Sequence, residues 1–91
     1  MRVGLVKKHK HTRVVVLKTG LEAGAVRVAP LTRTKPRRGT RCHEVKTFWG
    51  DFWVLLDQVD VVDDSDLVNT WTPPDQLDRG QIDTITRELE K

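Results

Sequence analysis

The stretch RVVVLK, residues 13–18, decides the fold class of this chain. Its consecutive valines and its leucine disfavour a helix, because β-branched side chains lose rotamer freedom there, and they suit a strand that is buried on both faces. A turn at residues 19–20 follows, and residues 25–29 form a second apolar run. The short connection between the two runs predicts an antiparallel hairpin.

Shorter segments are expected to extend this hairpin into a sheet. Residues 2–6 predict a short strand, and residues 7–11 a basic loop. Residues 42–48 predict another strand, followed by a turn at residues 50–51. The intervening stretch RTKPRRGTR, residues 33–41, is expected to be a loop, because its like charges repel each other and it has no apolar side chain to bury.

The stretch FWVLLDQVDVV, residues 52–62, predicts either one long strand or two strands joined at a kink near residues 57–58. In its second part Val59 and Val61 alternate with polar residues. This alternation predicts one apolar face that includes both valines and one solvated face.

The C-terminal part of the chain predicts a helix. An acidic turn at residues 63–66 is expected to direct Leu67 inward, and the helix then begins near residues 73–75 or after Asp78, and runs to residue 91. Asp78 has Gln81 three positions later, which is a capping pattern, and Gly80 favours either the later start or a frayed first turn. Helical spacing places one apolar stripe against the sheet, formed by Ile82, Ile85 and Leu89.

About five strands and one helix indicate a mainly β protein with a C-terminal helix. The short strands favour a small antiparallel sheet that closes as a barrel. The length of 91 residues suits one domain, residues 1–91, with its function on one surface or groove.

Charge is distributed unevenly along the chain. Residues 1–47 contain 13 Lys or Arg and 2 Asp or Glu, a net charge of +11, whereas residues 48–91 contain 3 and 11, a net charge of −8. If the halves stay apart in space, one face is strongly basic and attracts polyanions, nucleic acid first among them. If they interleave, the charge serves solubility.

No segment approaches the roughly 20 apolar residues that cross a bilayer, and the N-terminal apolar run is too short for a secretory signal. With the single Cys42, this predicts a cytoplasmic protein without membrane contact, in which the cysteine is a small strand residue.

Metal and nucleophile chemistry find little support in the sequence. His9 and His11 share a strand face only in an extended segment, and His43 with Cys42 would have to join them to bind a metal. Ser65 stands among acids, and Cys42 points to the opposite strand face from His43. We therefore expect no metal ion and no cofactor.

Large aromatic side chains are few. Trp53 is expected in the core or in a dimer contact, whereas Trp49 and Trp71 lie beside predicted turns, where core packing and stacking on a base or a partner both stay open.

The end of the strand predicted at residues 25–29 suggests a phosphate site. In RVAPLTR, residues 27–33, Pro30 is followed by the hydroxyl of Thr32, with an arginine at each end of the stretch. Either Pro30 stops the strand and Thr32 lies in an ordinary turn, or Thr32 and its basic neighbours contact a phosphate. Arg13 begins the partner strand, and antiparallel pairing brings these two ends together. A guanidinium and a hydroxyl suit the charge that develops on a cleaved phosphodiester.

These motifs together resemble the MazF/PemK toxins of bacterial toxin–antitoxin pairs. The resemblance consists of TRVVVLK, then GAVRVAPLTR, a basic loop, VLLDQVDVVDDSDL and a final amphipathic helix, over roughly residues 12–90. It implies an SH3-like barrel of the MazF/CcdB kind that forms a homodimer.

The resemblance also implies an activity, namely metal-independent, sequence-selective endoribonuclease cleavage of single-stranded RNA that leaves a 2′,3′-cyclic phosphate. The catalytic pair would be Arg13 and Thr32, with His11 or His9 assisting proton transfer, and an acidic antitoxin peptide would compete with RNA. The residues expected to guide RNA are Lys7, Lys8, Lys10, His11, Arg33, Lys35, Arg37 and Arg38.

The start of the chain suggests an alternative. Family members open with a longer loop before the arginine and follow it with a proline, where this chain has Val14. The alternative is a catalytically inactive module of the same fold, encoded by a phage or mobile element, that binds nucleic acid or a host protein. A third interpretation is a structural interaction domain that uses the acidic half.

Overall fold

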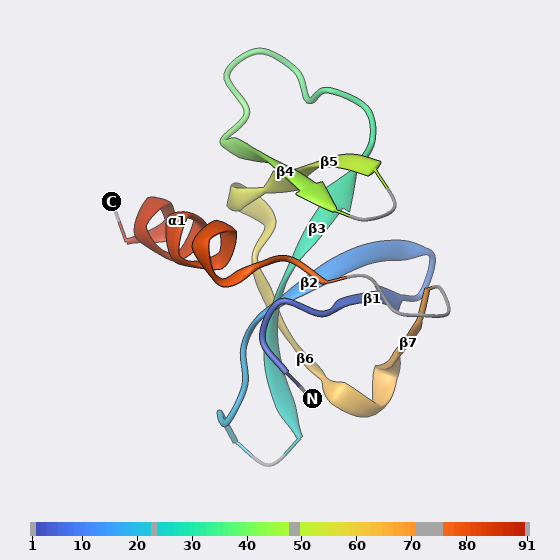
Figure 1. Ribbon diagram of the computed structural model, residues 1–91. Helices are drawn as coiled ribbons and strands as arrows, with labels where there is room; N and C mark the ends of the chain where they lie inside the picture. The colour runs from blue at the N-terminus through green and yellow to red at the C-terminus, as the bar shows by residue number, and fades with distance from the viewer. Residues whose placement is uncertain (1, 23, 48–49, 71–75, 91) are drawn as a thin grey trace.

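A computed structural model describes residues 2–22, 24–47, 50–70 and 76–90. Strands make up 49% of it, in an open antiparallel sheet with one C-terminal helix (Figure 1). The elements are, in order, β1 (Val6–His9), β2 (Thr12–Lys18), β3 (Ala25–Thr32), β4 (Cys42–Thr47), β5 (Gly50–Leu55), the 3-10 turn η1 (Leu56–Gln58), β6 (Asp60–Asp63), the 3-10 turn η2 (Asp64–Asp66), β7 (Leu67–Asn69) and α1 (Arg79–Leu89). The mainly β class with a C-terminal helix is confirmed.

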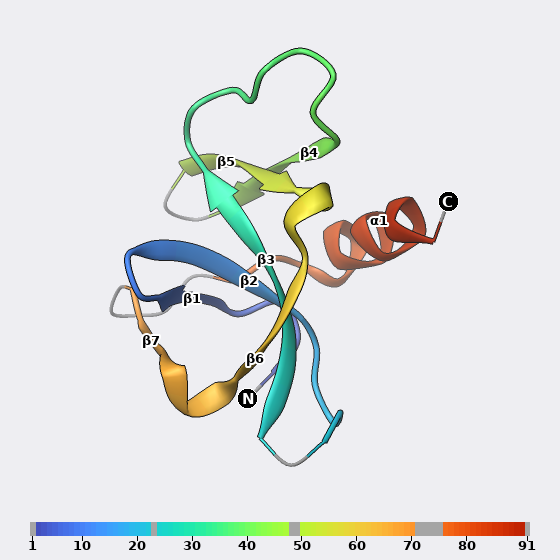
Figure 2. The same cartoon turned by 180° about the vertical axis from the view of Figure 1, so that it is seen from behind.

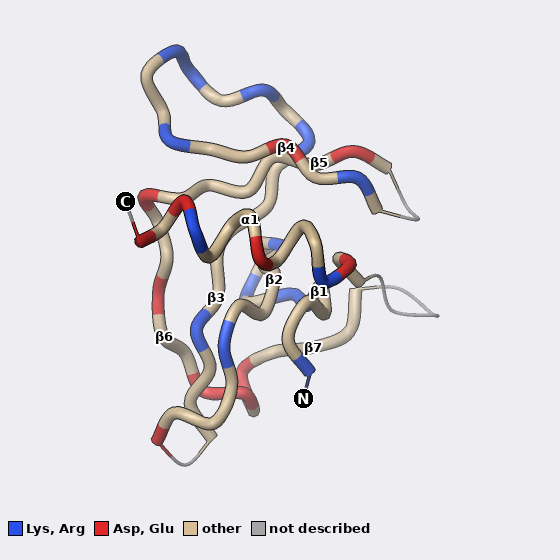
Figure 3. Tube along the Cα trace, turned by 60° about the vertical axis from the view of Figure 1, so that its left-hand side comes forward, with Lys and Arg blue, Asp and Glu red and all other residues tan. Residues whose placement is uncertain are grey.

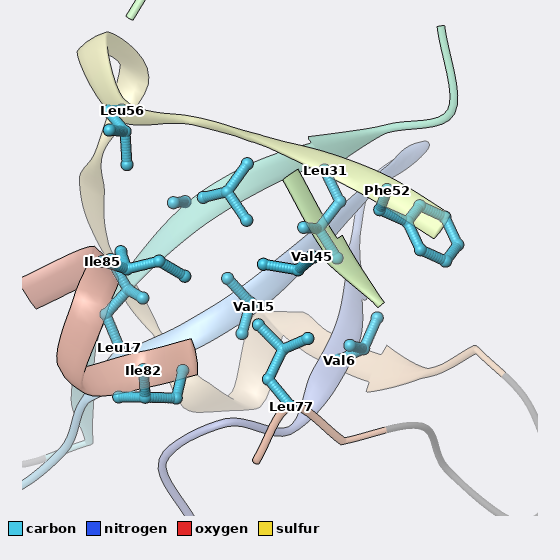
Figure 4. Close-up of a cluster of buried hydrophobic side chains, with 12 residues drawn as sticks. Val6, Val15, Leu17, Leu31, Val45, Phe52, Leu56, Leu77, Ile82 and Ile85 are labelled. Carbon is cyan, nitrogen blue, oxygen red and sulfur yellow. The ribbon is translucent and has the colours of Figure 1, made fainter. Parts of the chain in front are cut away.

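The valine-rich strand β2 is buried on both faces, as predicted, and it lies in the middle of the sheet. Val15 and Leu17 face the larger hydrophobic cluster, which β3, β5 and α1 complete (Figure 4). Val14 and Val16 face a second, smaller cluster, which includes Leu67. Burial on both sides explains why this strand lacks the alternation of a half-solvated one.

Strand β3 is longer than expected, because it continues through Pro30 to Thr32. Val16 exchanges hydrogen bonds with Gly4 and Leu5, so its backbone groups point away from β3, and so do those of Val14 two residues earlier. Val14 and its partner Pro30 are thus a non-hydrogen-bonded pair. On its other edge β3 pairs with β6 as far as residue 28 and with β5 from residue 31. Pro30 lies between the residues that pair with β6 and those that pair with β5, where its missing N–H removes no hydrogen bond between strands.

The sheet is strongly curled. Its order around the centre is β6, β3, β2, β1 and β7, and the two outer strands of this group are joined by η2 alone. A three-residue connection between the outer strands requires the sheet to bend back on itself. Figure 2 shows β3 passing from this curled group to the β4–β5 hairpin at its far end.

Near the N-terminus, the strand expected at residues 2–6 and the loop expected at residues 7–11 are both in the wrong position. The strand begins at Val6 and ends at His9, so the basic segment is mostly strand, and only Lys10 and His11 form the turn to β2. Gly4 has a φ of +94°, which ends extended structure before Val6. Lysine side chains are tolerated in a strand that leaves their ammonium groups in solvent.

Between β4 and β6 the two-strand alternative is correct, and η1 is the kink. The expected turn at residues 50–51 is wrong, since both residues belong to β5, and Phe48 lies outside the described residues. Val61 is 50% exposed, contrary to expectation, while Val62 packs on the smaller cluster. Val62 pairs with buried Val26 and Val61 with exposed Arg27, so β6 turns Val62 toward the smaller cluster. The pattern of residues 52–62 alone cannot anticipate this, because it depends on the pairing with β3.

Helix α1 begins after Asp78, the later of the two predicted starts, and the earlier one, at residues 73–75, lies outside the described residues. The Asp78 carboxylate accepts a hydrogen bond from the Gln81 N–H at 2.8 Å. Ile82 and Ile85 are buried in the larger cluster, with Leu89 packed against it, as the apolar stripe predicts.

Gln81 also joins the helix to the edge of the sheet. Its side-chain oxygen accepts from the Lys46 N–H at 2.8 Å, and its side-chain nitrogen donates to the Lys46 carbonyl at 3.1 Å. The carboxamide thus pairs with β4 as a neighbouring strand would. Leu67 is buried after η2 as predicted, and Cys42 is a half-buried strand residue.

Candidate functional site

An open cleft of about 560 Å³ lies at the end of the sheet where β3 leaves β2. The start of β2, the end of β3, η1 and β6 surround it, together with the β1–β2 turn. Its lining residues are His9, His11, Thr12, Arg13, Val14, Pro30, Leu31, Thr32, Arg33, Leu55, Gln58, Asp60 and Val62. The cleft therefore combines polar side chains with an apolar base continuous with the smaller cluster.

Arg13 and Thr32 both line this cleft, so the hairpin brings them to one end of the sheet as expected. They do not lie on the same face. Thr32 is two residues after Pro30, so its side chain is on the same face as those of Pro30 and of Val14, the partner of Pro30. Arg13 directly precedes Val14, so its side chain is on the opposite face. The two side chains therefore approach the cleft from different sides of the strand pair.

The Thr32 hydroxyl is oriented by its own turn. Its oxygen accepts a hydrogen bond from the Thr34 N–H at 3.2 Å. Because a hydroxyl has one proton to donate and that contact uses only a lone pair, the Thr32 proton can be given to a ligand oxygen.

Histidines complete the polar lining. His9 is the cross-strand partner of Thr12 and so shares the face of Thr32, while His11 belongs to the tight turn between β1 and β2. The structure thus places both histidines in the cleft, although the sequence had put them in a loop.

Sequence reasoning missed Thr12, Gln58 and Asp60. Asp60 pairs with Val28 and lies on the same face as Thr32, and its carboxylate also accepts from the Val61 N–H at 2.8 Å. No local pattern signals this position, because it depends on the register between β3 and β6, which are distant in sequence.

Among the expected RNA-binding cations, Arg33 alone joins Arg13 in the cleft lining. Its guanidinium lies over the Phe52 ring, 4.8 Å from the ring centre. The Lys7 ammonium donates to the Asn69 side chain at 2.6 Å. The cations on the strands and loop around the cleft are Lys8, Lys10, Lys35, Arg37 and Arg38, none of which lines it.

Of the two roles expected for Trp53, a core residue or a dimer contact, the core role is wrong. Trp53 is partly exposed and belongs to neither hydrophobic cluster, because it points to the opposite face from its buried neighbours Phe52 and Val54. The Lys35 ammonium lies 6.0 Å from its ring centre. Trp49 and Trp71 lie outside the described residues.

Opposite charges border each other on this molecule. Figure 3 shows Lys and Arg on β2, β3 and the long loop, Asp and Glu on β6 and its following turn, and charges of both signs on α1. Strand pairing places acidic β6 beside β3, so the two halves of the chain interleave in part. The positive charge is densest in the loop of residues 33–41.

One carboxyl group in the acidic segment has a shifted pKa. The Ser65 backbone N–H donates to the Asp63 carboxylate at 3.0 Å and the Ser65 hydroxyl donates at 2.9 Å, and together they lower the pKa of Asp63 below its usual value. Asp63 is the last residue of β6, where it caps η2, and it does not line the cleft.

No protein-family model, characterised protein or solved structure matches the chain. Among the described residues there is no helix with the length and apolar character needed to span a bilayer. The resemblance to the MazF/PemK toxins therefore depends on the order of the sequence motifs.

Proposed function

We propose that this protein is a metal-independent endoribonuclease of the MazF/PemK kind that cleaves single-stranded RNA. The observation that carries the proposal is the shared cleft, to which Arg13, Thr32 and the two histidines all contribute. A permanent cation, a hydroxyl donor and imidazoles are the groups that phosphodiester cleavage needs in the absence of a metal.

In the proposed reaction the ribose 2′-oxygen attacks the adjacent phosphorus. His9 removes the 2′-hydroxyl proton, and Arg13 and Thr32 stabilise the negative charge that develops on the non-bridging oxygens. The bond from phosphorus to the 5′-oxygen breaks as that oxygen takes a proton from His11. The products are a 2′,3′-cyclic phosphate and a 5′-hydroxyl, and no oxidant or metal takes part.

The proposal extends to architecture and partners. The three-residue connection between the outer strands β6 and β7 supports an SH3-like barrel. The dense positive charge of residues 33–41 supports competition between RNA and an acidic antitoxin peptide. The homodimer rests on the family resemblance.

A cleavage assay in EDTA tests the activity. Wild-type protein is expected to cut a single-stranded RNA and to leave cyclic phosphate ends, identified by mass spectrometry of the fragments. Thr32→Val removes the hydroxyl with little change of shape and is expected to slow cleavage about 100-fold, the usual effect of losing one charge-stabilising donor. Thr32→Ser is expected to retain most of the rate.

Thr40→Val is the matched control, because Thr40 lies in the basic loop and outside the cleft lining. It is expected to cleave at the wild-type rate. Equal rates for Thr32→Val and Thr40→Val would contradict a catalytic role for Thr32. A divalent cation requirement would contradict the metal-independent mechanism.

A second candidate is the inactive nucleic-acid-binding module. Two observations favour it: Arg13 and Thr32 come from different strand faces, and the Asp60 carboxylate lines the cleft, where it would repel a phosphate. This candidate predicts salt-sensitive RNA binding with intact RNA after prolonged incubation.

A further inference from the structure

A row of three side chains crosses the sheet next to the cleft. Trp53 on β5 is paired with Thr32 on β3 at one side and with Glu44 on β4 at the other. Directly paired residues present their side chains on the same face, with Cβ atoms roughly 5 Å apart. A cleft residue, an aromatic ring and a carboxylate are therefore neighbours in one line.

The ring of Trp53 is accessible and faces a cation. Its side chain is partly exposed, whereas Phe52, on the other face of the same strand, is completely buried. The Lys35 ammonium, 6.0 Å from the Trp53 ring centre, shows that this ring face is directed toward the basic loop. An aromatic face beside an exposed cation suits a nucleotide, since the base stacks on the ring and the cation contacts the phosphate.

Glu44 supplies the hydrogen-bonding side of the row. It is exposed, and within the described residues its carboxylate has no hydrogen-bond or ion-pair partner. A carboxylate only accepts hydrogen bonds. Guanine is the base whose Watson–Crick edge presents two adjacent donors, N1–H and N2–H, that match both carboxylate oxygens; the other three bases offer a single donor group there.

We propose that Trp53 and Glu44 form a guanine-binding subsite beside the scissile position, which rests on the proposed function for the placement of RNA in the cleft. The base stacks on Trp53, its Watson–Crick edge faces Glu44, and its phosphate lies toward Lys35. Because Thr32 is the neighbour of Trp53, the guanine belongs to a nucleotide next to the cleaved linkage. The subsite would give this cleft a sequence preference that its phosphate-binding groups cannot supply.

Binding of uncleavable RNA tests the subsite separately from catalysis. The probes are fluorescent 2′-O-methyl oligonucleotides that contain one guanine, or one adenine in its place, within a uridine background. Anisotropy at fixed salt is expected to give a roughly tenfold preference for the guanine probe. Glu44→Gln is expected to abolish this ratio, while Asp83→Asn, which makes the same charge change on α1, leaves it unchanged.

Substitutions of Trp53 separate stacking from structure. Trp53→Leu is expected to weaken binding of the guanine probe about tenfold, and Trp53→Phe to weaken it much less, because phenylalanine still stacks. Thermal unfolding of both variants checks that each is folded at the assay temperature. Equal affinity of wild type and a folded Trp53→Leu would overturn the stacking role.

The two proposals fail in different ways. Guanine preference that depends on Glu44 without any RNA cleavage would support the subsite and contradict the ribonuclease. Cleavage in EDTA with no base preference, or with a preference that Glu44→Gln leaves intact, would support the ribonuclease and overturn the subsite. No binding of either probe by the wild type would overturn the subsite, and the absence of RNA cleavage in EDTA as well would overturn both.

Discussion

Gly4 joins three parts of the chain through its backbone. Its N–H donates to the Val16 carbonyl at 2.7 Å, and its carbonyl accepts from the Leu77 N–H at 2.8 Å. Its φ of +94° is a conformation that residues with a Cβ rarely adopt, and a Cβ added here would lie 2.8 Å from the Leu77 carbonyl oxygen. Both the dihedral and the contact exclude a side chain.

Gly4→Ala is therefore expected to lower the free energy of unfolding by about 2–3 kcal/mol, from backbone strain together with the displaced segment before α1. Gly20→Ala provides the comparison: Gly20 has a φ of +72°, but no atom of the described residues lies within 4 Å of an added Cβ, so strain alone is expected to cost about 1 kcal/mol. Urea unfolding measures both. Similar losses for the two variants would show that the contact with Leu77 is unimportant.

Residues of the site differ in how far their positions could be predicted. Arg13 and Thr32 belong to one hairpin, so local pairing is enough to place them at the same end of the sheet. Asp60 and Trp53 reach the site through β3–β6 and β3–β5 pairing, whose register no local pattern sets. The phase difference between Arg13 and Thr32 likewise follows from the Val14–Pro30 pair.

Among the elements, η2 depends on a charged cap. Asp63 precedes it, and the hydrogen bonds from Ser65 to its carboxylate favour the ionised form, so the pKa of Asp63 lies below the reference of 3.8 in the folded protein. A lowered folded pKa contributes stability above the unfolded pKa and loses it as the pH falls through the folded value. This carboxyl group is thus expected to make the folded protein less stable as the pH falls.

Asp63→Asn keeps an oxygen that can cap η2 but removes the charge. We expect the wild type to lose stability more steeply than Asp63→Asn as the pH is lowered from 5 toward 2, as measured by urea unfolding at each pH. An NMR titration of the Asp63 carboxyl carbon in the folded protein gives its pKa directly. Parallel pH profiles for the two proteins would contradict this role of Asp63.

Strand β3 illustrates what element-level patterns can and cannot indicate. The apolar run predicts its first part, but Pro30 suggests an end that the structure does not have. Proline is compatible with the strand only because two partners succeed each other along one edge at that point. Such an exchange of partners depends on the folded sheet. The partial burial of Val62 in place of Val61 likewise depends on the pairing of β6 with β3.

For the whole molecule, charge placement matters more than net charge. The acidic and basic halves border each other, and the loop of residues 33–41 projects from the β4–β5 end (Figures 1 and 3). Lys18 and Arg27 are cross-strand partners in the other half of the β2–β3 pair, away from the cleft end. RNA that enters the cleft would therefore meet the loop cations and not this pair.

Replacing Arg37 and Arg38 with serine is expected to reduce the slope of log affinity against log salt concentration by about 1.4, since each phosphate contact to a single strand contributes about 0.7. The same double replacement at Lys18 and Arg27 removes equal charge and is expected to leave the slope unchanged. Anisotropy titrations at several salt concentrations measure both. Equal reductions would indicate attraction by net charge alone.

The overall arrangement was predictable at the level of class. Residue patterns identify the β2–β3 hairpin, the acidic turn and the amphipathic helix, because each is a local feature. The curling of the sheet depends on the pairing of β7 with β1, between residues about 60 positions apart. Pairing over such distances reflects the packing of whole strands, which periodicity does not record.

The contact of Gln81 with β4 has a consequence for colloidal behaviour. An unprotected outer strand offers its peptide groups as a template for other molecules, and proteins commonly block such margins. Here a carboxamide on the helix occupies the peptide groups of Lys46. Detachment of α1 would expose the hydrophobic core and the edge strand β4 at the same time. The helix therefore protects this protein from self-association as well as from unfolding.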